Sequence, residues 1–263
     1  MSKTAAKENW YFQRATFSQD KNYIKDDIFL FQDWIYPVKI EEFKDKTALD
    51  CGCGRGQHLK FLLPYIKRGV GIDLNTAKIA REYIKSGKVE IIEGDIASVL
   101  LREKFDIVYS IGVLQHTDNP TASFNNIKKH LKKGGRMIVW VYSWEGNFLN
   151  RIILEPLIRY FFSKINRKIL LTLSMCMTLI LYIPIFSIYL LPLKFLPFYE
   201  YFKNFRRISL QKNFQNVFDK LNAPQTHFIK KETVEKWFNK DEFDSVCISR
   251  YAGVSWRGTG VLK

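Results

Sequence analysis

Cysteine and acidic residues are scarce in this sequence. Four cysteines among 263 residues exclude a small fold held together by disulfides. Cys51 and Cys53 are separated by one residue, which is too close for an ordinary disulfide, and no second Cys/His cluster completes a metal site. A reducing, cytosolic environment fits this pattern best. Residues 1–17 contain no apolar segment of the kind found in a secretory signal, so we expect none.

Because acidic residues are scarce, the chain is strongly basic. It has 41 Lys and Arg against 26 Asp and Glu, a net charge of +15. Between residues 151 and 220 the basic residues outnumber the acidic ones by eleven to three, so over half of the net charge lies in about a quarter of the chain. An anionic partner, either nucleic acid or an acidic membrane surface, would explain this excess. An ordinary solvated surface rich in lysine explains it equally well.

The hydrophobic pattern predicts an α/β fold. Hydrophobic residues make up 47% of the chain and aromatic residues 15%, which excludes a disordered chain. From residue 47 to 142, short runs of Ile, Val and Leu alternate with helical patterns, which indicates βαβ units and a parallel sheet with helices on both faces. We expect strands at 47–50, 69–74, 88–93, 105–110 and 136–142, and helices at 57–66, 75–86 and 119–131.

The helix ends and the last fifty residues complete this prediction. Asn75 and Asn119 are the expected N-caps of the second and third helices, and Pro64 should end or kink the first. A short amphipathic helix is expected at 232–240. Two strands at 244–251 and 254–262 predict an antiparallel pair added to the parallel sheet.

A glycine-rich loop follows the first predicted strand and precedes a helix. It contains Gly52, Gly54 and Gly56, with Asp50 two residues before the first glycine. A loop that binds a dinucleotide has the spacing G-x-G-x-x-G and no such acid. A carboxylate at this position would repel a pyrophosphate and attract an ammonium. The sequence therefore predicts a nucleoside-like ligand that is cationic near the loop, and S-adenosylmethionine (SAM) has this shape.

Two further acids follow the next two strands. Asp73 ends the second strand, where its carboxylate could accept hydrogen bonds from both ribose hydroxyls, and Asp95 follows the third, where it could bind the adenine amino group. Each acid also has a purely structural alternative: Asp73 could cap a helix, and Asp95 could cap the turn that follows Asp95 itself. Three acids at the carboxyl ends of three successive strands favour a ligand site, because ligands of open α/β sheets bind there.

These motifs resemble those of the class I SAM-dependent methyltransferases. The segments that carry the resemblance are LDCGCGRG, GIDL, EGDI, FDIVYSIGVLQHTDNP and LKKGGRMIVWVY. It implies a seven-stranded Rossmann-like sheet, mostly parallel with the last strand antiparallel, and SAM as cofactor. Beyond the loop glycines, the residues that the resemblance places at the cofactor are Asp50, Asp73, Leu74, Asp95, Ile96, Ile111, Gly112 and Val113.

Three histidines are candidates for a general base, which methyl transfer needs only if the acceptor must lose a proton. His116 follows the fourth strand, where the resemblance implies that the acceptor arrives. His227 precedes the helix that contains Trp237 and Phe238, as in a bacterial branch of the family, and is the second candidate. His58 is expected to begin a helix and pack locally. The sequence Ser110-Ile111-Gly112-Val113 replaces the motif of amino-adenine and amino-cytosine methyltransferases, and no Pro-Cys nucleophile for cytosine C5 is present.

An apolar segment of 25 residues, 169–193, contains no charged side chain, and basic residues flank it at 164–168 and 194–207. It is long enough to span a membrane. A single span, however, would separate the first five strands from the last two. Three arrangements remain open. The segment forms a helical hairpin or kinked pair, broken at Pro184 or Pro192, that enters one leaflet. Alternatively, it forms a lid over an apolar pocket or a dimer interface, or it spans the membrane and the sheet lacks its last strands.

We therefore expect four parts: an N-terminal helical cap (1–46), a SAM-binding core (47–147), a basic hydrophobic insertion (148–212) and a C-terminal helix with the final strand pair (213–263). The leading hypothesis is a methyltransferase that acts on a lipid-linked or hydrophobic acceptor. Its expected location is the cytoplasm, peripheral to the inner face of the membrane through residues 164–207. The alternatives are a soluble enzyme with the insertion as lid or dimer interface and an inactive SAM-binding scaffold. A nucleic acid partner is disfavoured, and a homodimer remains open.

Overall fold

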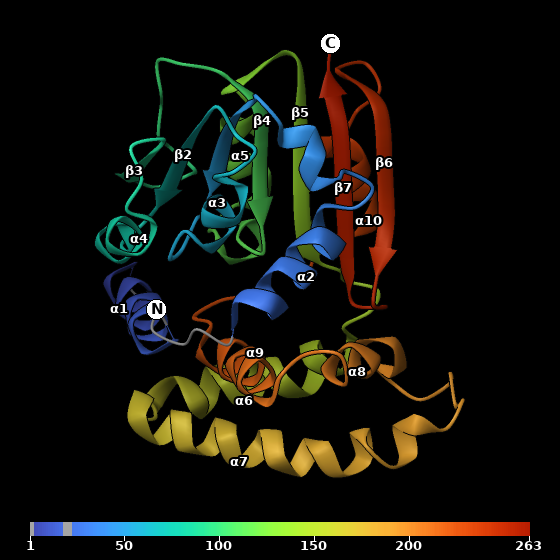
Figure 1. Ribbon diagram of the computed structural model, residues 1–263. Helices are drawn as coiled ribbons and strands as arrows, with labels where there is room; N and C mark the ends of the chain where they lie inside the picture. Colours follow the sequence, from blue (N-terminus) through green and yellow to red (C-terminus); the bar gives the residue numbers. More distant parts are fainter. Residues whose placement is uncertain (1–2, 18–22) are drawn as a thin grey trace.

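The computed structural model describes residues 3–17 and 23–263 and contains one mixed sheet of seven strands (Figure 1). The strand order is β3-β2-β1-β4-β5-β7-β6, in which β1 to β5 are parallel and β7 runs antiparallel to both of its neighbours. This confirms the predicted fold class, including the terminal antiparallel pair. The strands are β1 (Thr47–Cys51), β2 (Arg68–Asp73), β3 (Val89–Glu93), β4 (Phe105–Ile111), β5 (Leu131–Tyr142), β6 (Phe243–Tyr251) and β7 (Ser255–Leu262).

Helices cover both faces of the sheet, as the apolar strands require. On one face, Phe124 and Ile127 pack with Trp237 and Phe238 in a buried cluster. On the other, Phe31 packs with residues of the helices that follow β1 and β2. The helices of the two faces are α2 (Tyr23–Ile35), η1 (Ile40–Phe43), α3 (Gln57–Leu62), α4 (Ala77–Ile84), η2 (Leu114–His116), α5 (Pro120–Lys128) and α10 (Lys231–Trp237).

Several helix ends differ from the prediction. Helix α3 ends at Leu62 rather than at residue 66, because the chain turns before Pro64. The N-cap of α4 is Thr76 instead of Asn75. Asn119 caps α5 as expected, with its side chain accepting a hydrogen bond from the Ala122 amide (3.0 Å). That helix ends at Lys128, and β5 already begins at Leu131, where a helix had been expected.

The insertion forms a separate helical layer beneath the carboxyl ends of the strands (Figure 1). Because β6 and β7 complete the sheet after it, the chain enters and leaves the insertion on the same side. The alternative of a spanning segment with an incomplete sheet is therefore wrong. The elements of this layer are η3 (Asn150–Leu154), α6 (Glu155–Tyr160), η4 (Phe162–Lys164), α7 (Arg167–Ile185), η5 (Ile188–Leu190), α8 (Tyr199–Phe205) and α9 (Leu210–Asn222).

Helix α7 is one continuous helix that ends just after Pro184, so the chain breaks at the first of the two predicted prolines. Its inner side packs on α9 in a third buried cluster, which includes Leu170, Ile185 and Phe218. Residues 210–222 form one helix, so the expected boundary between 212 and 213 falls inside α9. Within the described residues, α7 is the one helix long and apolar enough to cross a membrane, judged by length and composition.

The N-terminal helix α1 (Lys3–Phe17) lies beside the carboxyl ends of β2 and β3 and contacts α9 (Figure 1). Asn9 and Gln13 on α1 form hydrogen bonds with Asn222 on α9. The first and last parts of the chain therefore meet at the edge of the sheet where a ligand is expected. Residues 1–2 and 18–22 of the predicted cap lie outside the described residues.

Candidate functional site

The glycine loop turns sharply between β1 and α3. Gly52, Gly54 and Gly56 have φ angles of +93°, +56° and +81°, in the region that glycine adopts readily. The amides of Gly52 and Cys53 both donate to the Ile72 carbonyl (2.8 and 2.9 Å), which fixes the loop to the end of β2. A Cβ at Gly52 would overlap the side chain of Val113. Glycine at position 52 therefore lets the Val113 side chain approach the backbone of the loop closely.

Asp50 lies at the end of β1, directly beneath this loop, and is 1% exposed. Among the residues that the structure describes, its Oδ2 has no hydrogen-bond partner, and Nδ1 of His58, a histidine that burial keeps neutral, is 3.9 Å away. Burial, with a smaller contribution from Asp73, raises the pKa of Asp50 to about 8. At neutral pH this carboxyl therefore holds a proton, unlike the carboxylate that the sequence suggested. A buried acid without a partner fits a cationic group nearby, which would favour its ionised form.

Asp73 links the loop to the end of β2. Its Oδ2 accepts a hydrogen bond from the Gly54 amide (2.9 Å), and its Oδ1 accepts one from the Thr76 hydroxyl (2.7 Å). The side chain remains half-exposed. Oδ1 also accepts hydrogen bonds from the Thr76 and Asn75 amides (3.3 and 3.4 Å), whereas Oδ2, which accepts from the Gly54 amide, has a second lone pair for another donor. Asp73 thus holds the turn before α4, and its Oδ2 still offers an acceptor at the expected ribose position.

Asp95 and its neighbours lie one strand further along the same edge. Asp95 Oδ1 accepts a hydrogen bond from the Ala97 amide (2.9 Å), so the capping alternative for this residue is realised. The Asp95 carboxyl is half-exposed, as is Leu74 after β2. Ile96 is buried in the core. The structure therefore places these residues at the expected strand ends without itself identifying a ligand.

Ile111, Gly112 and Val113 follow β4 beside the glycine loop. Gly112 has a φ angle of +72°, and its amide donates to the Trp140 carbonyl on β5 (2.9 Å). Ile111 is buried, and Val113 packs on Gly52. These three residues thus form the wall between the loop and the end of β5.

Helix α1 covers the loop from the open side. The guanidinium of Arg14 lies over Gly54, about 3.1 Å from the position that a Cβ there would take. The ring of Trp10, one turn earlier, lies 5.1 Å from the ring of His116. The positive charge of Arg14 at the loop was not anticipated from the sequence, because nothing local marks this arginine among the other basic residues.

His116 lies at the end of β4, as predicted, and lines a large pocket. Its Nδ1 is 2.8 Å from the Gln225 carbonyl, which can only accept, so Nδ1 carries the proton and Nε2 has the free lone pair. Burial lowers the pKa of His116, although Asp219 and the Gln225 carbonyl oppose this. The ring is therefore neutral near pH 7, the state that a general base requires.

The other two histidines do not line this pocket. The His227 side chain is exposed, and its amide donates to the Gln115 carbonyl (2.7 Å), so this residue positions the chain beside His116. His58 is buried and stacks on Phe31 with a centroid distance of 4.6 Å. Burial lowers the pKa of His58 to about 3. His58 thus packs locally, as its sequence position suggested.

The pocket lies between the sheet and the insertion, where the carboxyl end of β5, the turn between β6 and β7, α2 and η2 contribute to its lining. It encloses about 900 Å³, including the space at its open mouth. The aromatic residues that line it are Trp34, Trp140, Tyr142, Tyr201, Phe205, Phe228 and Tyr251. Its polar lining includes Asn147, Asn150, Glu155, Asn204, Asn216, Asp219 and Thr226. An apolar body with a few polar groups fits this lining, as in most sites for small molecules.

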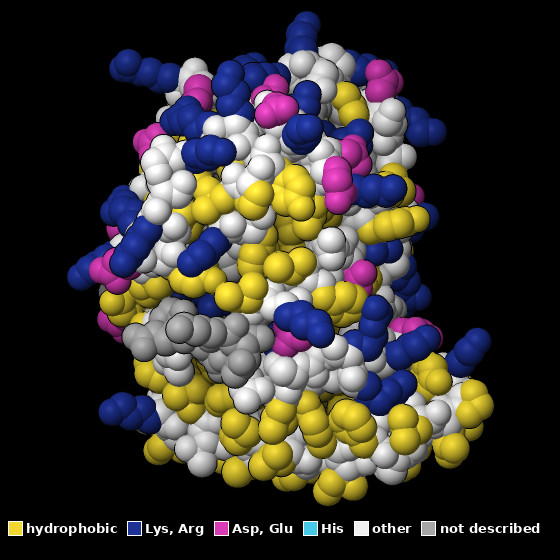
Figure 2. Space-filling model, in the orientation of Figure 1, with side chains coloured by type: hydrophobic (Ala, Val, Ile, Leu, Met, Phe, Trp, Pro, Cys, Tyr) yellow, Lys and Arg dark blue, Asp and Glu magenta, His cyan; other side chains and the backbone are white. Residues whose placement is uncertain are grey.

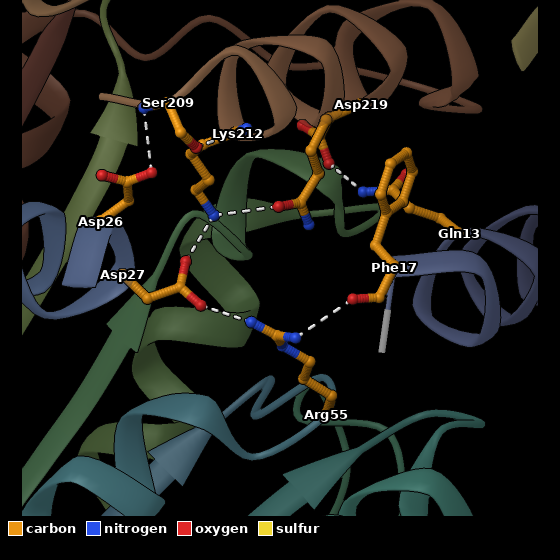
Figure 3. A network of polar contacts seen from close by, with 9 residues as sticks. Gln13, Phe17, Asp26, Asp27, Arg55, Ser209, Lys212 and Asp219 are labelled. Carbon is orange, nitrogen blue, oxygen red and sulfur yellow. Dashed lines mark hydrogen bonds and ion pairs between the residues drawn. The ribbon is translucent and has the colours of Figure 1, made fainter. Parts of the chain in front are cut away.

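A buried ionic cluster ties the glycine loop to the helices around it (Figure 3). Asp27 on α2 forms ion pairs with Arg55 of the loop and with Lys212 on α9 (2.5 Å for the latter). Burial alone would raise the pKa of Asp27, but the two cations outweigh it and hold the pKa below its ordinary value. Arg55 also donates to the Phe17 carbonyl at the end of α1 (3.2 Å). The conformation of the loop therefore depends on α1, α2 and α9.

Asp219 is a site residue that the sequence did not single out. It lines the pocket from α9, and its Oδ1 accepts a hydrogen bond from Gln13 Nε2 on α1 (2.5 Å; Figure 3). Burial, followed by the charge of Asp219, raises the pKa of Tyr142 well above its usual range. Tyr142 therefore keeps its proton and can donate a hydrogen bond into the pocket.

Comparison with known proteins agrees with this geometry. A family model described as a methyltransferase domain matches residues 49–139, from β1 to β5. The match includes the glycine loop, Asp73, Asp95 and His116, and it confirms the resemblance on which the predicted enzyme class and cofactor rest.

Curated relatives match the same part of the chain. A tRNA U34 carboxymethyltransferase from Sulfurovum sp. (strain NBC37-1) is 26% identical over 147 residues, which cover 51% of this chain and 48% of the relative. A protein of the same name from Actinobacillus pleuropneumoniae serotype 3 (strain JL03) is 31% identical over 124 residues, covering 44% of this chain and 38% of the relative. The chain thus spans about half the length of these relatives or less.

Solved structures share the whole fold at low identity. Magnesium protoporphyrin IX methyltransferase (ChlM) from Synechocystis PCC 6803, with bound SAH, has a TM-score of 0.56 and 14% identity. The alignment covers 100% of this chain and 100% of ChlM. N-methyltransferase NodS from Bradyrhizobium japonicum WM9, in complex with S-adenosyl-L-homocysteine (SAH), has a TM-score of 0.51 and 12% identity over 97% of this chain and 98% of NodS. At this identity the likeness establishes the fold.

Proposed function

We propose that this chain is a SAM-dependent methyltransferase that transfers a methyl group to a hydrophobic or lipid-linked acceptor and works at a membrane surface. The observation that carries the proposal is the position of His116. This residue lines the large pocket and follows β4, the strand next to β1, from which the glycine loop leads. The methyltransferase domain supports the reaction class. SAM supplies an electrophilic methyl group when bound.

The residues present fit SAM group by group. Asp73 Oδ2 offers an acceptor to the ribose hydroxyls, and Asp95 lies where the adenine amino group is expected. The unpartnered Oδ2 of Asp50 fits the ammonium of the methionine part. Arg14, which lies over Gly54, fits its carboxylate. The cofactor would thus meet opposite charges at both ends of its amino acid.

The pocket residues provide what the acceptor needs. Much of the barrier to methyl transfer is lowered by holding the acceptor atom in line with the methyl group, which the aromatic walls do by confining it. The Nε2 of His116 accepts a proton if the acceptor atom carries one. Tyr142 donates a hydrogen bond, and Asp219 accepts one. His227, which lies outside the pocket, orients the segment that contains Gln225, the partner of His116.

Residues of the insertion on α6 and α8 line this pocket, so a lid over the acceptor site agrees with the geometry. A soluble enzyme with such a lid or an inactive scaffold that binds SAM remains the alternative to a membrane enzyme. A second candidate is modification of tRNA. The names of the curated relatives and the net charge of +15 favour it.

The test compares extracts of cells that express the chain with extracts of cells that express its Asp73→Asn variant. Each extract is incubated with SAM that carries a radioactive methyl group, and the lipid, small-molecule and tRNA fractions are counted. We expect the unmodified chain to label an apolar fraction and the Asp73→Asn variant to leave that fraction unlabelled. Label confined to tRNA would establish the second candidate, and SAM binding without any transfer would establish the scaffold.

A further inference from the structure

The outer side of helix α7 is mostly apolar, unlike the outer side of a surface helix in a water-soluble protein, and its buried side includes polar as well as apolar residues. Two polar residues, Ser174 and Thr178, are fully buried against the molecule. Their hydroxyls donate to the carbonyls one turn earlier, Leu170 and Ser174 (2.7 Å each), so burial leaves them paired. The opposite side carries exposed isoleucines, Ile180 at 64% and Ile183 at 72%. A soluble amphipathic helix turns its apolar side inward, so the surroundings of the outer side are expected to be apolar.

The exposed apolar surface continues beyond the helix. Phe186 directly follows α7 and is 47% exposed, and Phe195, in the segment that leads to α8, is 81% exposed. Figure 2 shows hydrophobic side chains along the whole lower edge of the molecule, over α7. We call this surface, formed by the outer side of α7 and residues 186–195, the α7 face. It is far more extensive than the scattered apolar residues of an ordinary surface.

The charge around the α7 face has one sign. No acidic residue occurs between Glu155 and Glu200. Lys164 and Lys168 are exposed at the start of α7, and Lys194 is exposed at the other end of the face. Each cation lies at an end of an uncharged stretch of 25 residues. Apolar side chains framed by lysines are complementary to an anionic bilayer surface, where the acyl chains meet negatively charged headgroups.

The orientation of α7 excludes a crossing and favours a helix that lies in the membrane plane. Both of its ends join parts of the same folded body, and its inner side packs along α9. We propose that the α7 face lies in the boundary between headgroups and acyl chains of an anionic bilayer, with the helix axis parallel to the membrane. The inference rests on the membrane association proposed above and names the surface responsible. The pocket lined by α6 and α8 then opens beside the bilayer, where an apolar acceptor is concentrated.

Sedimentation with vesicles tests this surface directly. The unmodified chain should sediment with vesicles that contain phosphatidylglycerol and much less with pure phosphatidylcholine. The double substitution Ile180→Ser and Ile183→Ser should weaken binding by at least about tenfold. Leu100→Ser is the matched control, because Leu100 is 73% exposed but lies outside the insertion. Lys168→Gln with Lys194→Gln should weaken binding to the anionic vesicles selectively.

Cys176 provides a second measurement, because it is exposed on α7 while Cys51 and Cys53 are buried. In a Cys247→Ser background, an environment-sensitive fluorophore on Cys176 should shift to the blue on addition of anionic vesicles. Quenchers placed high on the lipid chains should act more strongly than quenchers near the bilayer centre.

The contradicting results are distinct from a failure of methyl transfer. Unchanged fluorescence with no sedimentation would overturn the inference, and so would stronger quenching from the bilayer centre. A stable dimer that Ile180→Ser and Ile183→Ser dissociate, without vesicle binding, would also overturn it and assign the face to a second copy. SAM binding, measured in the same preparations, reports on the methyltransferase proposal separately.

Discussion

Replacing Asp50 by Asn should stabilise the protein, and the gain should increase with pH. Burial raises the pKa of Asp50 from 3.8 to about 8 in the folded state. The folded chain therefore keeps a proton that the unfolded chain releases, and stability falls as the pH rises from about 4 to about 8. The cost is about 1.4 kcal/mol per pH unit in this window, or roughly 4 kcal/mol at pH 7. Asparagine at position 50 removes this free-energy cost, because the asparagine amide does not titrate.

Urea denaturation of both proteins at several pH values measures this effect. The difference in free energy of unfolding should increase from pH 4 to pH 8 and stay constant above it. An unfavourable fit of the amide would shift all values equally and leave the slope unchanged. A difference that does not depend on pH would refute the argument.

The proton on Asp50 should also make the affinity for SAM depend on pH. A cation beside Asp50 favours the carboxylate, so SAM binding should release a proton and become tighter as the pH rises toward 8. In the Asp50→Asn variant this part of the pH dependence should vanish. Calorimetry in buffers of different ionisation enthalpy counts the released proton, and proton release by the variant equal to that of the unmodified chain would contradict the assignment.

Three other substitutions test the site. Lys212→Met leaves Arg55 as the remaining cation of the Asp27 cluster; it should cost about 3–5 kcal/mol of stability in urea denaturation, and an effect below about 1 kcal/mol would contradict a buried cluster. Arg14→Gln should weaken SAM binding about tenfold and leave adenosine binding unchanged, because adenosine has no carboxylate; equal losses for both ligands would contradict this role. His116→Asn should lower kcat by about 100-fold or more while SAM affinity changes little, and unaltered turnover would exclude His116 as the base.

The order of elements and the edge of the sheet that carries the glycine loop could be predicted because their signals are local. Runs of apolar residues defined the strands, and the glycine spacing marked the loop between β1 and α3. The acids Asp73 and Asp95 follow strands whose carboxyl ends share one edge of any parallel sheet. Helix ends were harder to predict, because Asn75 and Thr76 are adjacent residues that both suit an N-cap, and the structure has Thr76 there.

Contacts between distant segments could not be predicted. Asp27 and Lys212 are 185 residues apart, and no pattern in the sequence pairs them. Asp219 lies in the pocket because α9 packs beside α1 and the end of β5, and nothing in the local sequence marks it as a site residue. The exposed apolar side of α7 could not be identified from the sequence, because a segment rich in Leu and Ile is apolar on every side and only its packing shows that Ser174 faces inward.

Burial also changed the electrostatic expectation at the loop. The sequence suggested a carboxylate at Asp50 that repels phosphate. In the structure that group holds a proton, and Arg14 brings a positive charge to the same loop. We therefore propose that selectivity for SAM depends on Asp50 ionising when the cofactor's cation arrives.

Calorimetric titration of the intact chain with SAM, NAD and ATP tests the central claim most directly. We predict that SAM binds, that NAD and ATP bind much more weakly, and that Asp73→Asn reduces SAM affinity by at least about tenfold through the loss of charged hydrogen-bond acceptors. Tight binding of NAD or ATP together with no binding of SAM would contradict the assignment of the glycine loop and of the function built on it.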